Sequence, residues 1–140
     1  MSSALDNLCG PDKSLRSEPR DAKEFAGLKR SGHARLTDAA RVDNALESRF
    51  DLAYNAAHSF CLAALRWHGY RPANRYIVFQ VLPHTLGLGP EVWRVLAQCH
   101  ELRNLGEYEG DLNIDARIVN DLVTACRKVA AAVDALQRPD

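Results

Sequence analysis

The sequence has little of what marks the common function classes. Only 7% of its 140 residues are aromatic, it has one Met, and no apolar run approaches the ~20 residues of a membrane span. Its 18 basic and 18 acidic side chains cancel, which argues against a protein that coats nucleic acid or membrane through bulk charge. The first residues lack the basic and apolar segments of a signal peptide. We therefore expect one cytoplasmic domain without a membrane contact.

Motifs for metals, nucleophiles and phosphate loops are missing as well. The four cysteines, Cys9, Cys61, Cys99 and Cys126, lie far apart and form no C-x-x-C pair. Neither they nor the five histidines have the short ligand spacing of a zinc site. H-E-x-x-H, G-x-S-x-G, the Walker loop and G-x-G-x-x-G are absent too. We expect no metal site and no cofactor, and we interpret the cysteines as small core residues.

What the sequence does have is helix-forming composition. Ala and Leu dominate, while Ile and Val are sparse outside one short stretch. After a loose arm over residues 1–15, the pattern predicts a helix from Pro19 to about Arg30 that Ser31-Gly32 ends. A second, short helix is expected over residues 34–42.

The strongest helical pattern follows. Asn44 and Glu47 have the spacing of a capping box, which places the start of a long helix at Asn44. Apolar residues then recur at helical spacing on two faces as far as His68, and Gly69 ends the helix. A helix that is apolar on two sides is either central to a bundle or shared between a core and a partner.

The stretch Tyr76–Leu82 is ambiguous. Its β-branched and aromatic residues suit a strand, but no second strand is apparent to pair with it. We therefore predict a short helix that Asn74 caps and that breaks before Pro83.

Two more long helices complete the prediction. Pro90 begins one that ends near Gly110, and Asn113 or Asp111 caps the other. The expected fold class is all-α: an antiparallel up-and-down helical bundle of four main helices plus short ones, over residues 16–140.

The densest polar cluster lies at the end of the first of these two helices. His100, Arg103, Asn104, Glu107 and Tyr108 fall on adjoining stripes of about two helical turns. An Arg can fork onto phosphate or carboxylate, and an Asn can donate and accept at once. The alternative is that Arg103 and Glu107 form a solvated ion pair and that Tyr108 only packs.

Weaker candidates lie elsewhere in the chain. We expect His68 and His84 to line the same cavity as the polar cluster, or else to be structural histidines. Arg66, Arg71 and Arg75 form a small basic patch around the end of the long helix, which either holds phosphate or is simply solvated.

The long helix and the segment Arg103-Asn104-Leu105-Gly106-Glu107-Tyr108 together resemble the HEPN superfamily (higher eukaryotes and prokaryotes nucleotide-binding domains). The resemblance covers roughly residues 35 to 137. It implies a helical bundle that forms a homodimer and brings two copies of a short motif together. Many members are metal-independent ribonucleases, often toxins of toxin–antitoxin or phage-defence systems. Others are non-catalytic partners of nucleotidyltransferases.

The family motif is an Arg followed, four to six residues later, by a His. Arg103 matches the Arg, and Asn104 matches the polar residue that often follows it, but Tyr108 stands five residues after Arg103 where a His is expected. RNA cleavage needs an acid or base that works near neutral pH, which suits imidazole better than phenol. His100 is an alternative donor of that imidazole.

Three hypotheses remain open at this stage. We prefer a dimeric HEPN-like module that binds a nucleotide, RNA or a partner protein such as an antitoxin or a nucleotidyltransferase. Glu107, Arg71 and His84 would then contact the ligand together with Tyr54 and Asp51, since the long helix faces the inter-subunit cleft in that family. The second hypothesis is a ribonuclease that uses Arg103 with Tyr108 or His100. The third is a helical dimer without a small ligand.

Overall fold

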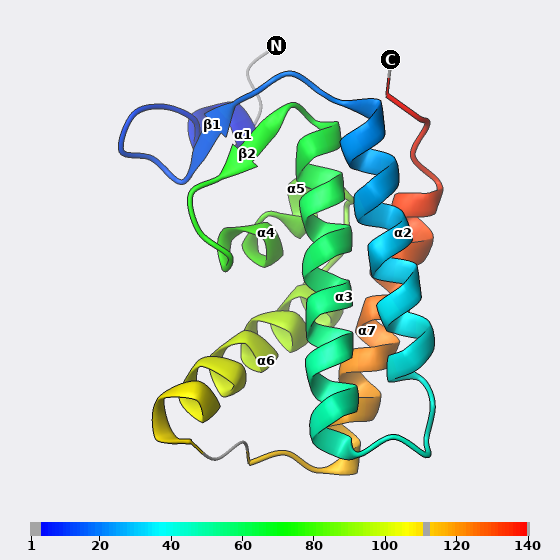
Figure 1. The fold of residues 1–140 in the computed structure, drawn as a ribbon. Coiled ribbons are helices and arrows are strands. Elements are labelled where there is room, and N and C mark those ends of the chain that lie inside the picture. Colours follow the sequence, from blue (N-terminus) through cyan, green and yellow to red (C-terminus); the bar gives the residue numbers. More distant parts are fainter. Residues whose placement is uncertain (1–3, 111–112, 140) are drawn as a thin grey trace.

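Four long helices form the protein in the computed structural model, which describes residues 4–110 and 113–139. They are α2 (Ala22–Ala39), α3 (Leu46–Trp67), α6 (Pro90–Glu109) and α7 (Ala116–Asp134). Their direction alternates along the chain, with α2 and α6 running against α3 and α7 (Figure 1). The predicted all-α up-and-down bundle is confirmed. No helix in the described part of the chain is long and apolar enough to cross a membrane.

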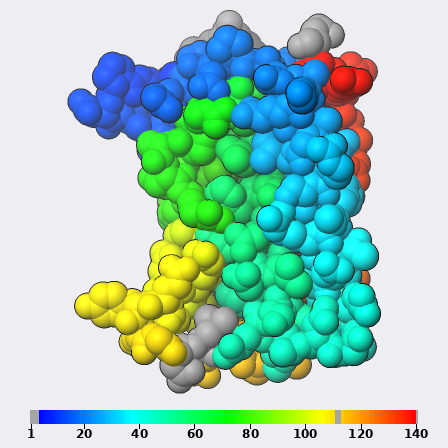
Figure 2. All heavy atoms as spheres, viewed as in Figure 1, coloured from blue at the N-terminus to red at the C-terminus, as the bar shows by residue number. Residues whose placement is uncertain are grey.

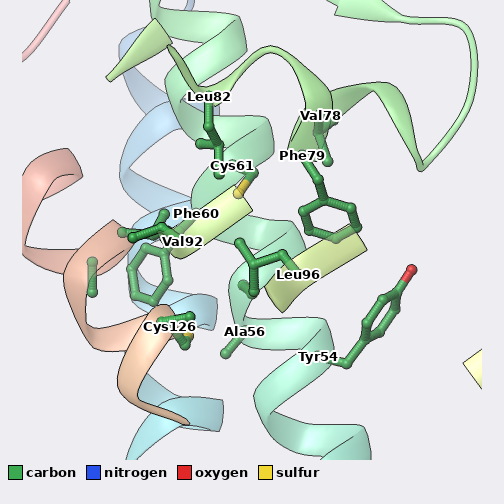
Figure 3. Packing of buried hydrophobic residues seen from close by; sticks show 14 of the residues in the cluster. Tyr54, Ala56, Phe60, Cys61, Val78, Phe79, Leu82, Val92, Leu96 and Cys126 are labelled. Atoms are coloured by element: carbon green, nitrogen blue, oxygen red, sulfur yellow. The ribbon is translucent and has the colours of Figure 1, made fainter. Parts of the chain in front are cut away.

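Helix α3 is the centre of the core. It packs against α2 and α7 and also contacts α6 and the short helices. Both of its predicted apolar faces are buried within this one chain: Ala53 and Ala57 lie on one face, Ala56 and Phe60 on the other. Small side chains let the neighbouring helices approach closely around the larger ring of Phe60 (Figure 3). Of the two alternatives for the long helix, the central position in a bundle is the one observed.

Helix α2 is longer than predicted because Gly32 does not end it. The helix continues to Ala39 and absorbs the expected short helix over residues 34–42. Gly32 is buried, and a Cβ atom placed there would lie 2.8 Å from the Phe60 ring. Close packing of α2 on α3, and not a helix end, therefore explains the glycine. The helix begins at Ala22, where the Asp21 side chain accepts hydrogen bonds from two backbone amides.

The predicted capping box at the start of α3 is wrong. Ala45 is the N-cap residue and makes no side-chain cap bond. The side chain of Asn44 instead donates to the backbone oxygen of Asp38 at 2.9 Å, which ties the turn to the end of α2. The other end of α3 is as predicted: the helix ends at Trp67, and Gly69 follows with a positive φ of 88°.

The boundaries of α6 and α7 are partly as predicted. Pro90 is the first residue of α6, and Gly110 ends it with a left-handed φ of 76°. Asp115, and not Asn113, caps α7 by accepting a hydrogen bond from the amide of Ile118 at 2.9 Å. The other predicted cap, Asp111, lies outside the described residues.

The ambiguous stretch after α3 is helical. Helix α4 (Ile77–Gln80) begins where the Asn74 side chain accepts from the Ile77 amide at 3.0 Å, as predicted. Helix α5 (Leu82–Thr85) follows directly and contains Pro83 in its first turn.

The N-terminal region departs from the expected loose arm. Helix α1 (Ala4–Asn7) precedes β1 (Leu15–Ser17), which pairs antiparallel with β2 (Tyr70–Pro72). The side chains of Leu5 and Leu15 are buried in the common core. Two isolated leucines give no periodic pattern, which is why the sequence did not predict this packing.

Two arginines and two glutamates connect β1, β2, α2 and α3. Arg66 is buried and donates through Nε to Glu24 at 2.6 Å. Arg71 donates to both Glu18 and Glu24 at 2.7 Å. Burial raises the pKa of Glu24, but the hydrogen bonds from Arg71 and Arg66 outweigh it, and the pKa is lowered overall. This network holds the fold together and uses Arg71 as a structural residue.

Three of the cysteines are core residues, as predicted. Cys61, Cys99 and Cys126 are buried free thiols. Burial raises the pKa of Cys99 and of Cys126 to about 12, so these thiols are uncharged at neutral pH.

Candidate functional site

Helix α6 divides into a packed half and an open half. All of its buried residues lie at or before Cys99. From His100 onward the helix extends obliquely away from α3, and its end projects from the body of the molecule (Figures 1 and 2). The predicted polar cluster is carried on this open half, where α3 and the segment before α4 are its neighbours.

His100 is held from both sides by hydrogen bonds. Its Nδ1 lies 2.8 Å from the Tyr54 hydroxyl, and its Nε2 lies 3.0 Å from the Asn104 amide nitrogen. Since that nitrogen can only donate, Nε2 accepts and Nδ1 carries the proton, which it donates to the Tyr54 oxygen. The hydroxyl proton of Tyr54 is then free to be donated to a further group.

Two guanidinium groups converge on the ring of Tyr54. Arg103 from α6 lies 4.9 Å from the ring centroid, and Arg75 from the segment before α4 lies 5.6 Å from it. Arg75 also donates to the side-chain oxygen of Asn55 at 3.1 Å. The aromatic face therefore positions two cations that come from distant parts of the chain.

The imidazole of His100 is kept neutral by these surroundings. Burial lowers its pKa, and the positive charges of Arg75 and Arg103 lower it further, while Glu101 acts in the opposite direction. The rings of Tyr76 and Phe79 lie 5.0 Å and 6.0 Å from it. His100 is therefore an uncharged hydrogen-bonding group at neutral pH.

A second histidine, His58, also belongs to this cluster. His58 meets the Phe79 ring edge-on, with a centroid separation of 6.1 Å, and its Nε2 is buried without a hydrogen-bond partner. Burial lowers its pKa to about 4, with smaller contributions from Arg75, His100 and Arg103. The cluster thus has two neutral imidazoles behind two fixed positive charges.

A cleft of about 380 Å³ opens beside the cluster, between the start of α3 and the end of α6. Arg103 lies at its edge, with Nη2 3.0 Å from a carboxylate oxygen of Glu107. Glu47 and Asp51 add two more carboxylates to the lining, and Phe50 forms part of its wall. The cleft therefore has carboxylate acceptors on both its α3 and α6 walls and one arginine at its border.

The structure brings together most of the residues predicted for the site. His100, Arg103, Asn104 and Tyr54 form connected contacts, and Glu107 and Asp51 line the adjoining cleft. Tyr108 is different, because its side chain is 92% exposed near the tip of α6. No hydrogen bond within the described part of the chain positions that hydroxyl for proton transfer.

Three predicted residues lie elsewhere. His84 and His68 line a different cavity, next to α1 and β2. His68 is fixed there by a 2.8 Å hydrogen bond with the backbone oxygen of Thr85. Arg71 belongs to the network with Glu18 and Glu24, so the predicted basic patch is divided and only Arg75 faces the site.

Two residues of the site, His58 and Asn55, were missed, and Arg75 was predicted only as part of the basic patch. His58 lies four residues after Tyr54 on α3, and that spacing is the one sequence signal that places both on a shared stripe. Asn55 and the position of Arg75 depend on how the segment before α4 folds back against α3. No local pattern specifies such a tertiary contact.

The arrangement suits a ligand that offers an anionic group to the two arginines and hydrogen-bond donors to the three carboxylates of the cleft. Among residues 4–110 and 113–139, no group of three or more His, Cys, Asp or Glu side chains is placed to hold a metal ion. Comparison of the chain with protein-family models, with curated proteins and with solved structures finds no match. The chemistry of the site therefore has to be argued from its own residues.

Proposed function

We propose that this protein is a HEPN-like binding module whose site, formed by α3, α6 and the segment before α4, takes a nucleotide or single-stranded RNA. The observation that carries the proposal is the convergence of Arg75 and Arg103 on the Tyr54 ring. Each of these guanidinium groups lies against the Tyr54 ring and is suited to a phosphate group, which accepts forked hydrogen bonds. Tyr54 itself is 1% exposed, so its part is to position the two arginines and His100.

The carboxylates of the cleft fit the rest of such a ligand. Ribose hydroxyls and base amino groups are donors, and Asp51 and Glu47 provide acceptors for them in the same cleft. Glu107 has another role, since it pairs with Arg103 at 3.0 Å in the free protein. An arriving phosphate would replace this carboxylate as the partner of Arg103.

A second copy of the chain completes the proposed unit. Leu105 and Tyr108 are apolar surfaces one turn apart on α6, and they are 53% and 92% exposed. Exposed large side chains on a projecting half-helix favour burial against a partner. In a homodimer built through this half of α6, the two sites would lie next to each other and could share one RNA strand.

A ribonuclease is the second candidate, and the neutral His100 beside Arg103 favours it. The lowered pKa leaves the imidazole free to accept a proton at neutral pH, while Arg103 would stabilise the charge on the phosphate. His100 would first have to exchange its hydrogen bond with Asn104 for one with the RNA 2′-hydroxyl. Tyr108 is not part of this proposal because its exposed hydroxyl is remote from the connected cluster.

Fluorescence anisotropy with a labelled short single-stranded RNA and with adenosine monophosphate as competitor tests the proposal. Arg103→Ala and Arg75→Ala should each weaken binding by about 10- to 100-fold, the value of one charge-assisted hydrogen bond. Arg94→Ala is the matched control, because Arg94 is an exposed arginine at the packed end of the same helix. Equal losses in all three variants would mean general charge attraction and would contradict the proposal.

The same preparations separate binding from cleavage. The RNA is incubated with a large excess of protein and without divalent metal, and its length is followed. If the wild type cuts RNA, His100→Gln should stop cleavage and retain folding, whereas Tyr108→Phe should cleave normally. If the RNA stays intact while Arg103-dependent binding is present, the protein is a binding module and not a nuclease.

A further inference from the structure

A buried arginine lies on the α7 side of α3. Arg49 lies in the first turns of α3 and is 7% exposed. Its Nε donates to the backbone oxygen of Ala39 at 2.8 Å, at the end of α2. Among residues 4–110 and 113–139, no carboxylate oxygen lies within 4.0 Å of this guanidinium. The terminal nitrogens of Arg49 are not among the buried unpartnered atoms, so they remain accessible in the cleft that Arg49 lines and are available to an anion.

The rest of the Arg49 guanidinium group faces a cleft. The cleft has a volume of about 290 Å³ and lies between the α2–α3 turn and α7. Its polar lining on α7 comes from Asn120, Thr124 and Arg127, which have the i, i+4, i+7 spacing of one helical stripe. No carboxylate lines this cleft, so its described walls carry two positive charges and no negative one.

We propose that this cleft binds a phosphoryl group, either as free phosphate or at the end of a small phosphate monoester. Two guanidinium forks, an amide and a hydroxyl from two helices provide more donors than the two oxygens of a carboxylate can accept. A phosphate has three or four such oxygens in a tetrahedral arrangement. Ala40, Val42 and Val123 form the apolar remainder of the lining, next to which a small organic group fits.

This site is independent of the proposed function. It is lined by Arg49 of α3, by α7 and by the α2–α3 turn, whereas the nucleotide site uses other residues of α3 together with α6 and the segment before α4. The two clefts share no lining residue.

Isothermal titration of the full chain with inorganic phosphate, and separately with glycerol 3-phosphate, tests the inference. Arg127→Gln should weaken binding at least about tenfold, since it removes a charge-assisted hydrogen bond. Arg49→Lys should do the same, because lysine keeps the charge but loses the fork. Arg117→Gln is the matched control: Arg117 is also on α7, and its side chain is 88% exposed.

The titrations can either support or overturn the proposed phosphate site. Binding that Arg127→Gln and Thr124→Val weaken, and that Arg117→Gln leaves unchanged, supports the site even if Arg49→Lys fails to fold. Tighter binding of glycerol 3-phosphate than of phosphate identifies a monoester as the ligand, and the reverse identifies free phosphate. No heat of binding at millimolar ligand, an equal effect of Arg117→Gln, or binding that depends on Arg103 and not on Arg127 would overturn the inference.

Discussion

At the scale of single residues, the unusual groups are the two neutral histidines beside two arginines. His58 has a buried ring nitrogen without a partner, and His100 is held between Tyr54 and Asn104. Protonating either imidazole would add a charge next to Arg75 and Arg103. The cluster is therefore stable only while both rings remain uncharged, and this gives the protein a defined response to acid.

We predict that His58 makes the fold sensitive to mild acid. Its pKa is about 4 in the folded protein and 6.5 in a free side chain. Between these values the unfolded chain binds a proton that the folded chain does not, so the free energy of unfolding falls as the pH falls. The loss from this group is at most about 3 kcal/mol.

Urea unfolding at several pH values between 6.5 and 4 measures this effect. His58→Leu should flatten the dependence markedly, because leucine does not titrate. The control His84→Gln, at an exposed position, should retain the slope of the wild type. A slope that His58→Leu leaves unchanged would show that another group is responsible.

Removing the carboxylate of Glu107 is expected to strengthen RNA binding. The Glu107 carboxylate forms an ion pair with Arg103 in the free protein, and both side chains are partly solvent-exposed. Glu107→Gln should leave the free energy of unfolding within about 1 kcal/mol, because such surface pairs contribute little. RNA should bind more tightly, because the phosphate no longer displaces a competing carboxylate.

A charge-matched variant controls for the change in net charge. Glu91→Gln removes one negative charge from the first turn of the same helix, far from the open half. It should tighten RNA binding much less than Glu107→Gln does. If both variants improve binding equally, competition for Arg103 is not the cause.

At the scale of secondary-structure elements, the contact between α2 and α3 depends on one glycine. A Cβ at Gly32 would lie 2.8 Å from the Phe60 ring, which is buried and cannot move aside freely. Gly32→Ala should therefore lower the free energy of unfolding by about 1–3 kcal/mol through overpacking. Gly27→Ala, in the same helix and with only the end of Arg30 nearby at 3.7 Å, should instead raise it by up to about 1 kcal/mol.

Thermal or urea unfolding of the two glycine variants gives the comparison directly. Both add the same methyl group to the same helix, so their difference isolates the contact with Phe60. Equal stabilisation by both substitutions would show that α2 and α3 are less closely packed at this point than the structure has them.

The sequence predicted the elements well where the signal is local. The two-faced apolar pattern of α3, Pro90 at the start of α6 and Asn74 at the start of α4 all depend on neighbours in the chain. The errors at Gly32 and Asn44 have a different origin. Each of these residues satisfies a contact with another element, and a rule based on sequence neighbours interprets it as a helix end or a cap.

The same distinction applies to the candidate site. Residues of α6 that share a helical face were predicted together from spacing alone, and they do lie together. Their partners on α3 and before α4 depend on tertiary packing, so His58 was missed and Arg75 was named only as part of a basic patch. Arg71 was assigned to the site because it is close in sequence to Arg75, but Glu18 and Glu24 bind it on another side of α3.

At the scale of the whole molecule, the open half of α6 is the surface proposed for a second copy. Leu105→Glu should shift the protein toward monomer, since it places a charge in the centre of the proposed interface. Sedimentation equilibrium over a range of concentrations measures the shift. Val42→Glu is the control, because Val42 is 84% exposed and lies in the α2–α3 turn. A wild type that is monomeric at all concentrations would contradict the dimer.

The central claim is that the cluster around His100 and Arg103 contacts the ligand. The most direct measurement is a nuclear magnetic resonance titration of the chain with ¹³C-labelled histidine rings against a short single-stranded RNA. We predict that the ring signals of His100 shift saturably, that those of the exposed His33 and His84 do not, and that Arg103→Ala abolishes the shift. Saturable shifts confined to other histidines, or an unchanged shift of His100 in Arg103→Ala, would contradict the account.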